Sequence, residues 1–224
     1  MHTSAIKYLL CGAINMTNLI AVETSDLVGS TTMSSNQLTL AMNALKECLS
    51  NIQTQHASII EFYRGDAFQI MYPNAVFSLR ASLLVKLYML WKLDFPVNIT
   101  QSLALGYITK PVITLHDRMD DVFVKSGRQL ASVGNAELGI FIASFDHASY
   151  LSLAFLNRIL HGLSAKQALV LYWYIKNDFP EHKKIAMLLN MSRQNVNTHL
   201  LRGNADLIKR FIYYFEHTVE DLSL

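Results

Sequence analysis

The sequence lacks most of the features that mark secreted, metal-clustered and membrane-spanning proteins. It has only two cysteines in 224 residues, Cys11 and Cys48, too few for a disulfide framework or a cysteine-based metal site. We therefore expect a protein of the reducing cytoplasm. No apolar run approaches the roughly 20 residues that a membrane-spanning helix needs, so no membrane partner is expected. The Gly-x-Ser-x-Gly, Walker and His-Glu-x-x-His motifs are also missing, which excludes several classes of hydrolase.

The residues that are present favour two folded units. Hydrophobic residues make up 51% of the chain and charged residues 16%, which is enough apolar material for a well-formed core. A chain of this length holds one large domain, or one medium domain and a small one. We predict an N-terminal extension over 1–15, an α+β domain over 16–145, a connector helix over 146–163 and a helical domain over 164–224.

The apolar and turn patterns of residues 16–145 predict the order β-α-β-β-α-β, followed by one more helix and strand. The strands are expected over 18–25, 58–63, 67–72, 97–109 and 138–144, and the helices from near Ser34, Pro73 and Ser126. Gly65-Asp66 is the expected hairpin turn between the second and third strands. This order is the split arrangement of a ferredoxin-like α+β sheet, in which the first strand ends beside that hairpin.

Two aspartates are expected to meet at this point of the sheet. Asp26 ends the first strand, and Asp66 lies in the hairpin. A carboxylate pair on neighbouring strands is typical of sites that hold Mg²⁺ together with nucleotide phosphates. Each aspartate alone also fits a structural role, as a helix cap or a turn residue. The expected cofactor is therefore Mg²⁺ with a nucleotide, or none.

The C-terminal third has the pattern of a DNA reader. Between residues 166 and 210 there are eight Lys or Arg and three acidic residues, a basic excess that suits phosphate contact. Two short helices, over 183–189 and 193–202, are separated by a three-residue turn, which predicts a helix-turn-helix. The side chains expected to contact double-stranded DNA are Lys183, Lys184, Ser192, Arg193, Gln194, Asn195, Asn197, Thr198 and Arg202.

That pattern has one open alternative, a small helical module for packing or protein docking that uses the same fold. A DNA reader would act as a homodimer, because two recognition helices must span about one turn of duplex. The apolar composition of the chain favours such a dimer as well.

The strand that ends in Ser25-Asp26-Leu27, its following Gly29-Ser30-Thr31 and the later run 64–68 (Arg-Gly-Asp-Ala-Phe) resemble the nucleotidyl cyclase superfamily. The layout looks closest to the bacterial SatD-like proteins, in which a degenerate cyclase-like domain precedes a helix-turn-helix. The resemblance implies that Asp26 and Asp66 bind metal and that the backbone of Gly29, Ser30 and Thr31 approaches phosphates. Arg64 could neutralise a phosphate or pair with Glu61 or Asp66.

The chain also departs from the cyclase pattern. Ala67 stands where the hairpin of diguanylate cyclases has a glutamate, and residues 126–132 lack the asparagine and arginine pair of class III cyclases in register. Loss of such a stabilising cation lowers phosphoryl-transfer rates strongly. We therefore expect a DNA-binding transcription regulator with a degenerate cyclase-like domain that is not an enzyme. The alternatives are an active Mg²⁺-dependent nucleotidyl cyclase with a regulatory helical domain, and a protein–protein adaptor.

Overall fold

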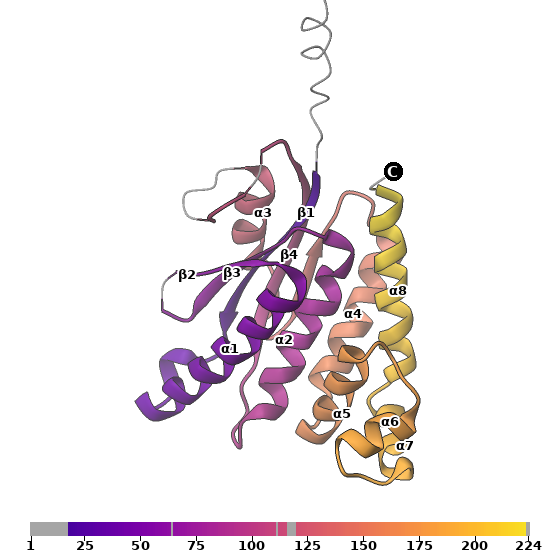
Figure 1. Cartoon of the computed structure of the whole chain (residues 1–224). Helices are drawn as coiled ribbons and strands as arrows, with labels where there is room; N and C mark the ends of the chain where they lie inside the picture. Colours follow the sequence, from indigo (N-terminus) through magenta and orange to yellow (C-terminus); the bar gives the residue numbers. More distant parts are fainter. Residues whose placement is uncertain (1–17, 64, 111, 116–119, 223–224) are drawn as a thin grey trace, which may run out of the picture.

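The computed structural model describes residues 18–63, 65–110, 112–115 and 120–222, and it forms a five-stranded sheet with helices on both faces (Figure 1). The strands are β1 (Asn18–Leu27), β2 (Ile59–Tyr63), β3 (Ala67–Tyr72), β4 (Ile99–Ile108) and β5 (Leu138–Phe141), in the order β2-β3-β1-β4-β5. All neighbours pair antiparallel except β4 and β5. The α+β class and the split arrangement of the first four strands are thereby confirmed.

The helices follow the capping signals of the sequence closely. They are α1 (Ser35–His56), α2 (Ser78–Lys92), α3 (Asp121–Leu130), α4 (His147–His161), α5 (Ala165–Lys176), α6 (His182–Leu188), α7 (Arg193–Arg202) and α8 (Ala205–Leu222), with short 3₁₀ turns η1 (Ser30–Thr32) and η2 (Ala75–Phe77). Ser34 and Gln37 form a capping box at the start of α1, as Ser164 and Gln167 do for α5. Such reciprocal bonds satisfy backbone groups that a helix end leaves unpaired.

Two helix starts were predicted wrongly, and the first is that of α2, which was expected from near Pro73 but begins at Ser78, after the 3₁₀ turn η2. The sequence places the start of α3 at Ser126, but the helix already begins at Asp121. Its first turn carries Val122 and Phe123, which pack against the sheet in a small apolar cluster. Gly106 permits this close packing, since a Cβ there would lie 2.9 Å from the Cβ of Val122. Because acidic residues lie next to this first turn, the sequence pattern there predicts a loop.

The α2 helix lies at the centre of the molecule, between the sheet and the C-terminal helices (Figure 1). Eleven of its residues, from Ser78 to Met89, are buried. One hydrophobic cluster runs from β1 and α1 through α2 into α5 and α8, so apolar packing is continuous across the predicted domain boundaries. No helix in the described ranges is both long and apolar enough to cross a membrane.

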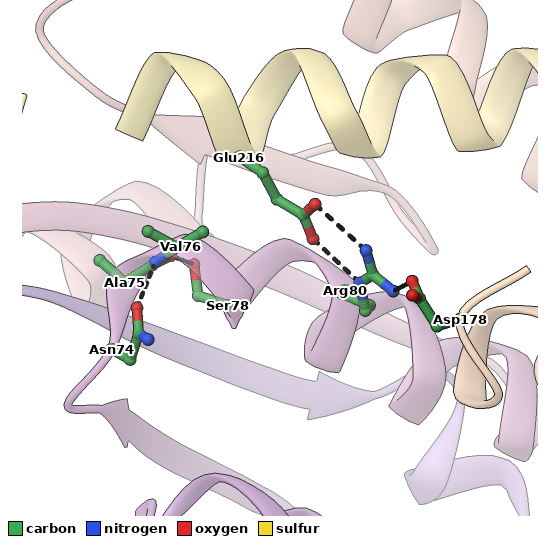
Figure 2. Close-up of polar contacts among 7 residues, drawn as sticks. All are labelled: Asn74, Ala75, Val76, Ser78, Arg80, Asp178 and Glu216. Carbon is green, nitrogen blue, oxygen red and sulfur yellow. Dashed lines mark hydrogen bonds and ion pairs between the residues drawn. The ribbon is translucent and has the colours of Figure 1, made fainter. Parts of the chain in front are cut away.

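An arginine on α2 ties the C-terminal helices to the sheet domain. Figure 2 shows the Arg80 guanidinium between Glu216 of α8 and Asp178 of the loop after α5. Its Nε and Nη2 donate to the Glu216 carboxylate at 2.9 and 3.1 Å, and its Nη1 donates to Asp178 at 2.6 Å. The Arg80 and Glu216 side chains are only 12% and 11% exposed. This bidentate geometry fixes α8 against α2.

A second carboxylate lies inside the core itself. Glu23 of β1 is fully buried and accepts hydrogen bonds at 2.5–2.8 Å from Ser25, Tyr72, Ser82 and Gln101. Nearby, the buried Lys86 of α2 donates to the Ile99 carbonyl at 2.6 Å. Burial lowers the pKa of Lys86 to about 7, although the charge of Glu23 acts in the opposite direction. No pattern in the sequence predicts this network.

Candidate metal site and candidate nucleic-acid interface

The structure brings Asp26 and Asp66 together at one end of the sheet. Ser25 of β1 pairs with Phe68 of β3, so the next step of the register places Asp26 beside Ala67 and next to Asp66. Burial raises the pKa of the Asp26 carboxyl, and the charge of Asp66 and a hydrogen bond to it raise this pKa further. The backbone N–H of Leu27 acts in the opposite direction. The two carboxylates thus repel each other in a partly desolvated place.

Both carboxylates have an oxygen that lacks a partner. Within the described ranges, Oδ1 of Asp26 and Oδ2 of Asp66 are buried and receive no hydrogen bond. A buried anionic oxygen without a donor is unfavourable unless a cation or a water satisfies it. A divalent cation between the two side chains would relieve both the repulsion and the missing bonds.

The chemistry of this pair suits Mg²⁺ rather than a structural metal. No group of three or more His, Cys, Asp or Glu side chains in the described part of the chain can hold a metal ion. A structural zinc needs four such ligands, whereas Mg²⁺ is held by one or two carboxylates and completes its octahedron with waters and phosphate oxygens. The residues present therefore fit a magnesium ion that arrives with a phosphate-bearing ligand.

The predicted phosphate loop directly follows β1. Gly29 has φ of 71° and ψ of 18°, a left-handed conformation that favours glycine, and it precedes η1. The Thr32 N–H and hydroxyl both donate to the Gly29 carbonyl, at 3.0 and 2.8 Å. Ser30 is half-buried and Thr31 is exposed. Arg64, the fourth residue predicted to contact the nucleotide, lies outside the described residues.

A polar cluster that was not predicted from the sequence lies beside the carboxylates. The Thr24 and Ser126 hydroxyls lie 2.9 Å apart, and Gln69 donates to them at 3.0 and 3.3 Å. Thr24 and Asp26 are two positions apart on β1, so they share the face of the sheet that α3 covers. The alternation of side chains along β1 indicates that Thr24 lies on the same face as Asp26. It does not reveal the partner of Thr24, because Ser126 is distant in the sequence.

The C-terminal helices present the predicted DNA-contacting residues at the surface. Val196 and Leu200 of α7 are buried together with Ile185 and Ala186 of α6, which fixes one helix against the other. Eight of the nine predicted side chains are exposed and Thr198 is half-buried: Lys183, Lys184, Ser192, Arg193, Gln194, Asn195, Asn197 and Arg202 make up the exposed set.

Two of these residues also have local structural roles. The Ser192 hydroxyl caps α7 by accepting the Asn195 N–H at 3.1 Å. The Thr198 hydroxyl donates to the Gln194 carbonyl at 2.9 Å within the same helix. The side chains of Arg193, Gln194 and Asn197 make the exposed surface of α7 basic and rich in amides.

The comparisons with known proteins find similarity in structure but not in sequence. No model of a protein family matches the chain, and no curated protein matches its sequence. Among solved structures, it is similar to the guanylyl cyclase Cya2 (TM-score 0.45, 14% identity, 55% of this chain and 75% of that one). It is also similar to the adenylyl cyclase CyaB from P. aeruginosa (0.44, 20%, 62% and 81%).

A third similar structure is the guanylate cyclase domain of RhGC from Catenaria anguillulae in complex with GTP, with a TM-score of 0.44, 16% identity and coverage of 55% of this chain and 78% of that one. All three TM-scores are below 0.5, so the function has to follow from the residues and geometry above.

Proposed function

We propose that the protein is a DNA-binding regulator, of the SatD-like layout, whose degenerate cyclase-like sheet domain binds Mg²⁺ with a nucleotide. The observation that carries the proposal is the exposed set of basic and amide side chains on α6 and α7, over a buried apolar contact between these helices. We interpret α6, the turn and α7 as a helix-turn-helix, in which the second helix enters the major groove.

The chemistry of α7 supports this assignment. Arginine can donate two hydrogen bonds to guanine, and glutamine or asparagine can do so with adenine. Arg193, Gln194 and Asn197 lie in the first half of α7, where recognition helices contact bases. Lys183 and Lys184 are exposed at the start of α6, where they can contact phosphates and position the protein.

The sheet domain has the supporting role in this proposal. The Asp26–Asp66 pair binds Mg²⁺, and Gly29, Ser30 and Thr31 lie beside the phosphates of its nucleotide. Arg64 is proposed as a further phosphate contact. The protein acts as a homodimer on double-stranded DNA, in the reduced cytoplasm that its two cysteines suggest.

A salt titration of binding to mixed-sequence duplex DNA tests the proposal. We expect the logarithm of the affinity to fall steeply with the logarithm of salt, by about 0.9 per phosphate contact. Arg193→Ala should weaken binding by about 1–3 kcal/mol if it contacts a base. Lys46→Ala, which removes an exposed cation from α1, is the matched control and should leave binding unchanged. Absence of binding at low salt and micromolar protein would refute the proposal.

One observation favours a second function, an active nucleotidyl cyclase. The unpartnered oxygens of Asp26 and Asp66 are as suited to a catalytic metal as to a ligand-sensing one. Formation of the 3′,5′-cyclic nucleotide from ATP or GTP with Mg²⁺ or Mn²⁺, with pyrophosphate as the leaving group and lost in Asp26→Asn, would establish it. An adaptor function would remain if neither DNA binding nor nucleotide binding or turnover were found.

A further inference from the structure

An apolar groove between α4 and α8 is left open at the surface. It has a volume of about 550 Å³, and its walls include Ala148, Phe155 and Ile159 of α4 and Leu207 and Phe211 of α8. Phe155 is 63% exposed and Leu207 54% exposed. Contiguous exposed apolar patches on a folded protein usually mark an interaction surface.

The same face carries a ridge that matches the groove. Leu151 is 59% exposed and lies one turn before Phe155 on α4. At helical spacing, Ala148, Ser152, Phe155 and Ile159 form one stripe along the groove. A surface that offers both a ridge and a groove can pair with itself, which a two-fold interface requires.

The charges at the two ends of α4 are arranged for an antiparallel partner. At its start Asp146 is exposed and lines the groove, and it caps the helix by accepting the Ser149 N–H at 2.8 Å. At its end Arg158 is exposed in the last turn, outside the groove wall. Arg210 of α8 lines the groove but is paired with Asp206 at 2.8 Å. The exposed part of α4 therefore has an acidic start and a basic end.

We propose that this groove is the dimer interface and that its occupant is α4 of a second copy of the chain, in antiparallel orientation. In this arrangement Asp146 of each copy faces Arg158 of the partner copy. Two-fold symmetry then places the residue midway between these positions, Ser152, at the axis. Its small side chain permits close approach of the two helices, and Leu151 and Phe155 fill the grooves on either side. The inference rests on the proposed function, because it gives the proposed homodimer a surface.

Cross-linking at the axis tests the arrangement directly. In a Cys11→Ser background, Ser152→Cys should form a disulfide-linked dimer under mild oxidation, because the two sulfur atoms meet within bonding geometry only near the axis. The remaining Cys48 is buried, and burial raises the pKa of its thiol to about 12, so it reacts slowly. Ser50→Cys, an exposed serine of α1, is the matched control. Equal cross-linking rates for the two variants would overturn the proposal.

Sedimentation of the full chain across a range of concentrations gives a second test. We expect a reversible dimer whose dissociation constant rises at least tenfold in Phe155→Glu and about two- to fivefold in Arg158→Glu, as exposed ion pairs contribute little. Leu40→Glu, an exposed leucine on α1, should change nothing. A monomer at all concentrations, or a dimer that ignores both groove variants, would overturn the proposal. A monomer at all concentrations would also remove the homodimer from the proposed function, whereas a dimer that ignores the groove variants would leave it intact; contact of the chain with DNA is tested separately by Arg193→Ala.

Discussion

Two acidic residues on β1 lie three positions apart and have opposite surroundings. Glu23 is fully buried among four hydroxyl and amide donors, on the face of the sheet that packs against α2. Asp26 is half-buried on the opposite face and lies beside a second carboxylate, with one oxygen unpartnered in the described structure. One strand thus carries a satisfied carboxylate and an unsatisfied one.

The difference separates an acid that stabilises the fold from one that is available for binding. A fully satisfied buried network makes the core rigid and unique. A pair of carboxylates that repel each other lowers stability, and such groups are found where a ligand or reaction makes use of them. The same residue class on the same strand therefore serves different purposes, according to what the neighbouring elements supply.

Removal of Glu23 should have the largest effect. Glu23→Ala leaves four buried donors and the Lys86 amine without their acceptor or counter-charge, so we expect a loss of about 3–5 kcal/mol in the free energy of unfolding, measured by denaturant titration. Asp26→Ala should cost far less. Equal losses in the two variants would contradict the comparison. The double variant Glu23→Leu with Lys86→Met should recover part of the loss.

The pH dependence of stability sharpens the same comparison. The pKa of Lys86 is about 7 in the folded chain, whereas a lysine in the unfolded chain has a pKa near 10.5. Between these two pH values the unfolded chain therefore binds more protons than the folded chain. Stability should therefore rise with pH in this window, by up to about 1.4 kcal/mol per pH unit. Lys86→Met should remove this slope. If the slope persists in the variant, other titrating groups cause it.

Magnesium should stabilise the protein through the unsatisfied pair. At about 100 times the dissociation constant, a ligand that binds only the folded state adds about 2.7 kcal/mol. We expect the melting temperature to rise with Mg²⁺ or Mn²⁺ and to fall back when EDTA removes the ion. Asp26→Asn should lose the response. An identical rise in that variant would place the cation elsewhere on the chain.

The smallest effect is expected from Asp26→Asn without metal. The raised pKa means that the folded state holds its proton more tightly, so stability falls as the pH rises through the titration of Asp26. The amide removes this repulsion, worth about 1 kcal/mol for a solvated pair, and the melting temperature at pH 7 should rise by about 2–4 °C. Glu47→Gln, on the exposed face of α1 and paired with Lys92 at 2.9 Å, should not raise it.

Local signals in the sequence were sufficient to predict the strands of the sheet and the proximity of the two carboxylates. Alternation and turn residues predicted the strands, and the strand order then brought Asp26 beside Asp66. The Glu23 network was not predictable, because its donors Tyr72, Ser82 and Gln101 come from three other elements. Hydrogen bonds between distant positions leave no periodic pattern in a sequence.

The junction of the two predicted units was missed for the same reason. Arg80 and Glu216 are 136 positions apart, and a charged residue on an apolar helix gives no sign of its partner. The pattern of α2 did indicate a buried helix, but not that α5 would cover its outer face. The division into an α+β domain and a helical domain therefore stays a prediction.

The burial of α2 has a consequence for synthesis of the protein on the ribosome. The helix is complete at Lys92, but α5 begins only at Ala165 and α8 at Ala205. At a translation rate of about 5–20 residues per second, the ribosome needs several seconds to make the covering helices. During this interval the nascent chain exposes the outer apolar face of α2, a surface that chaperones bind. The outer face of α2 is therefore buried only after α5 and α8 have been synthesised.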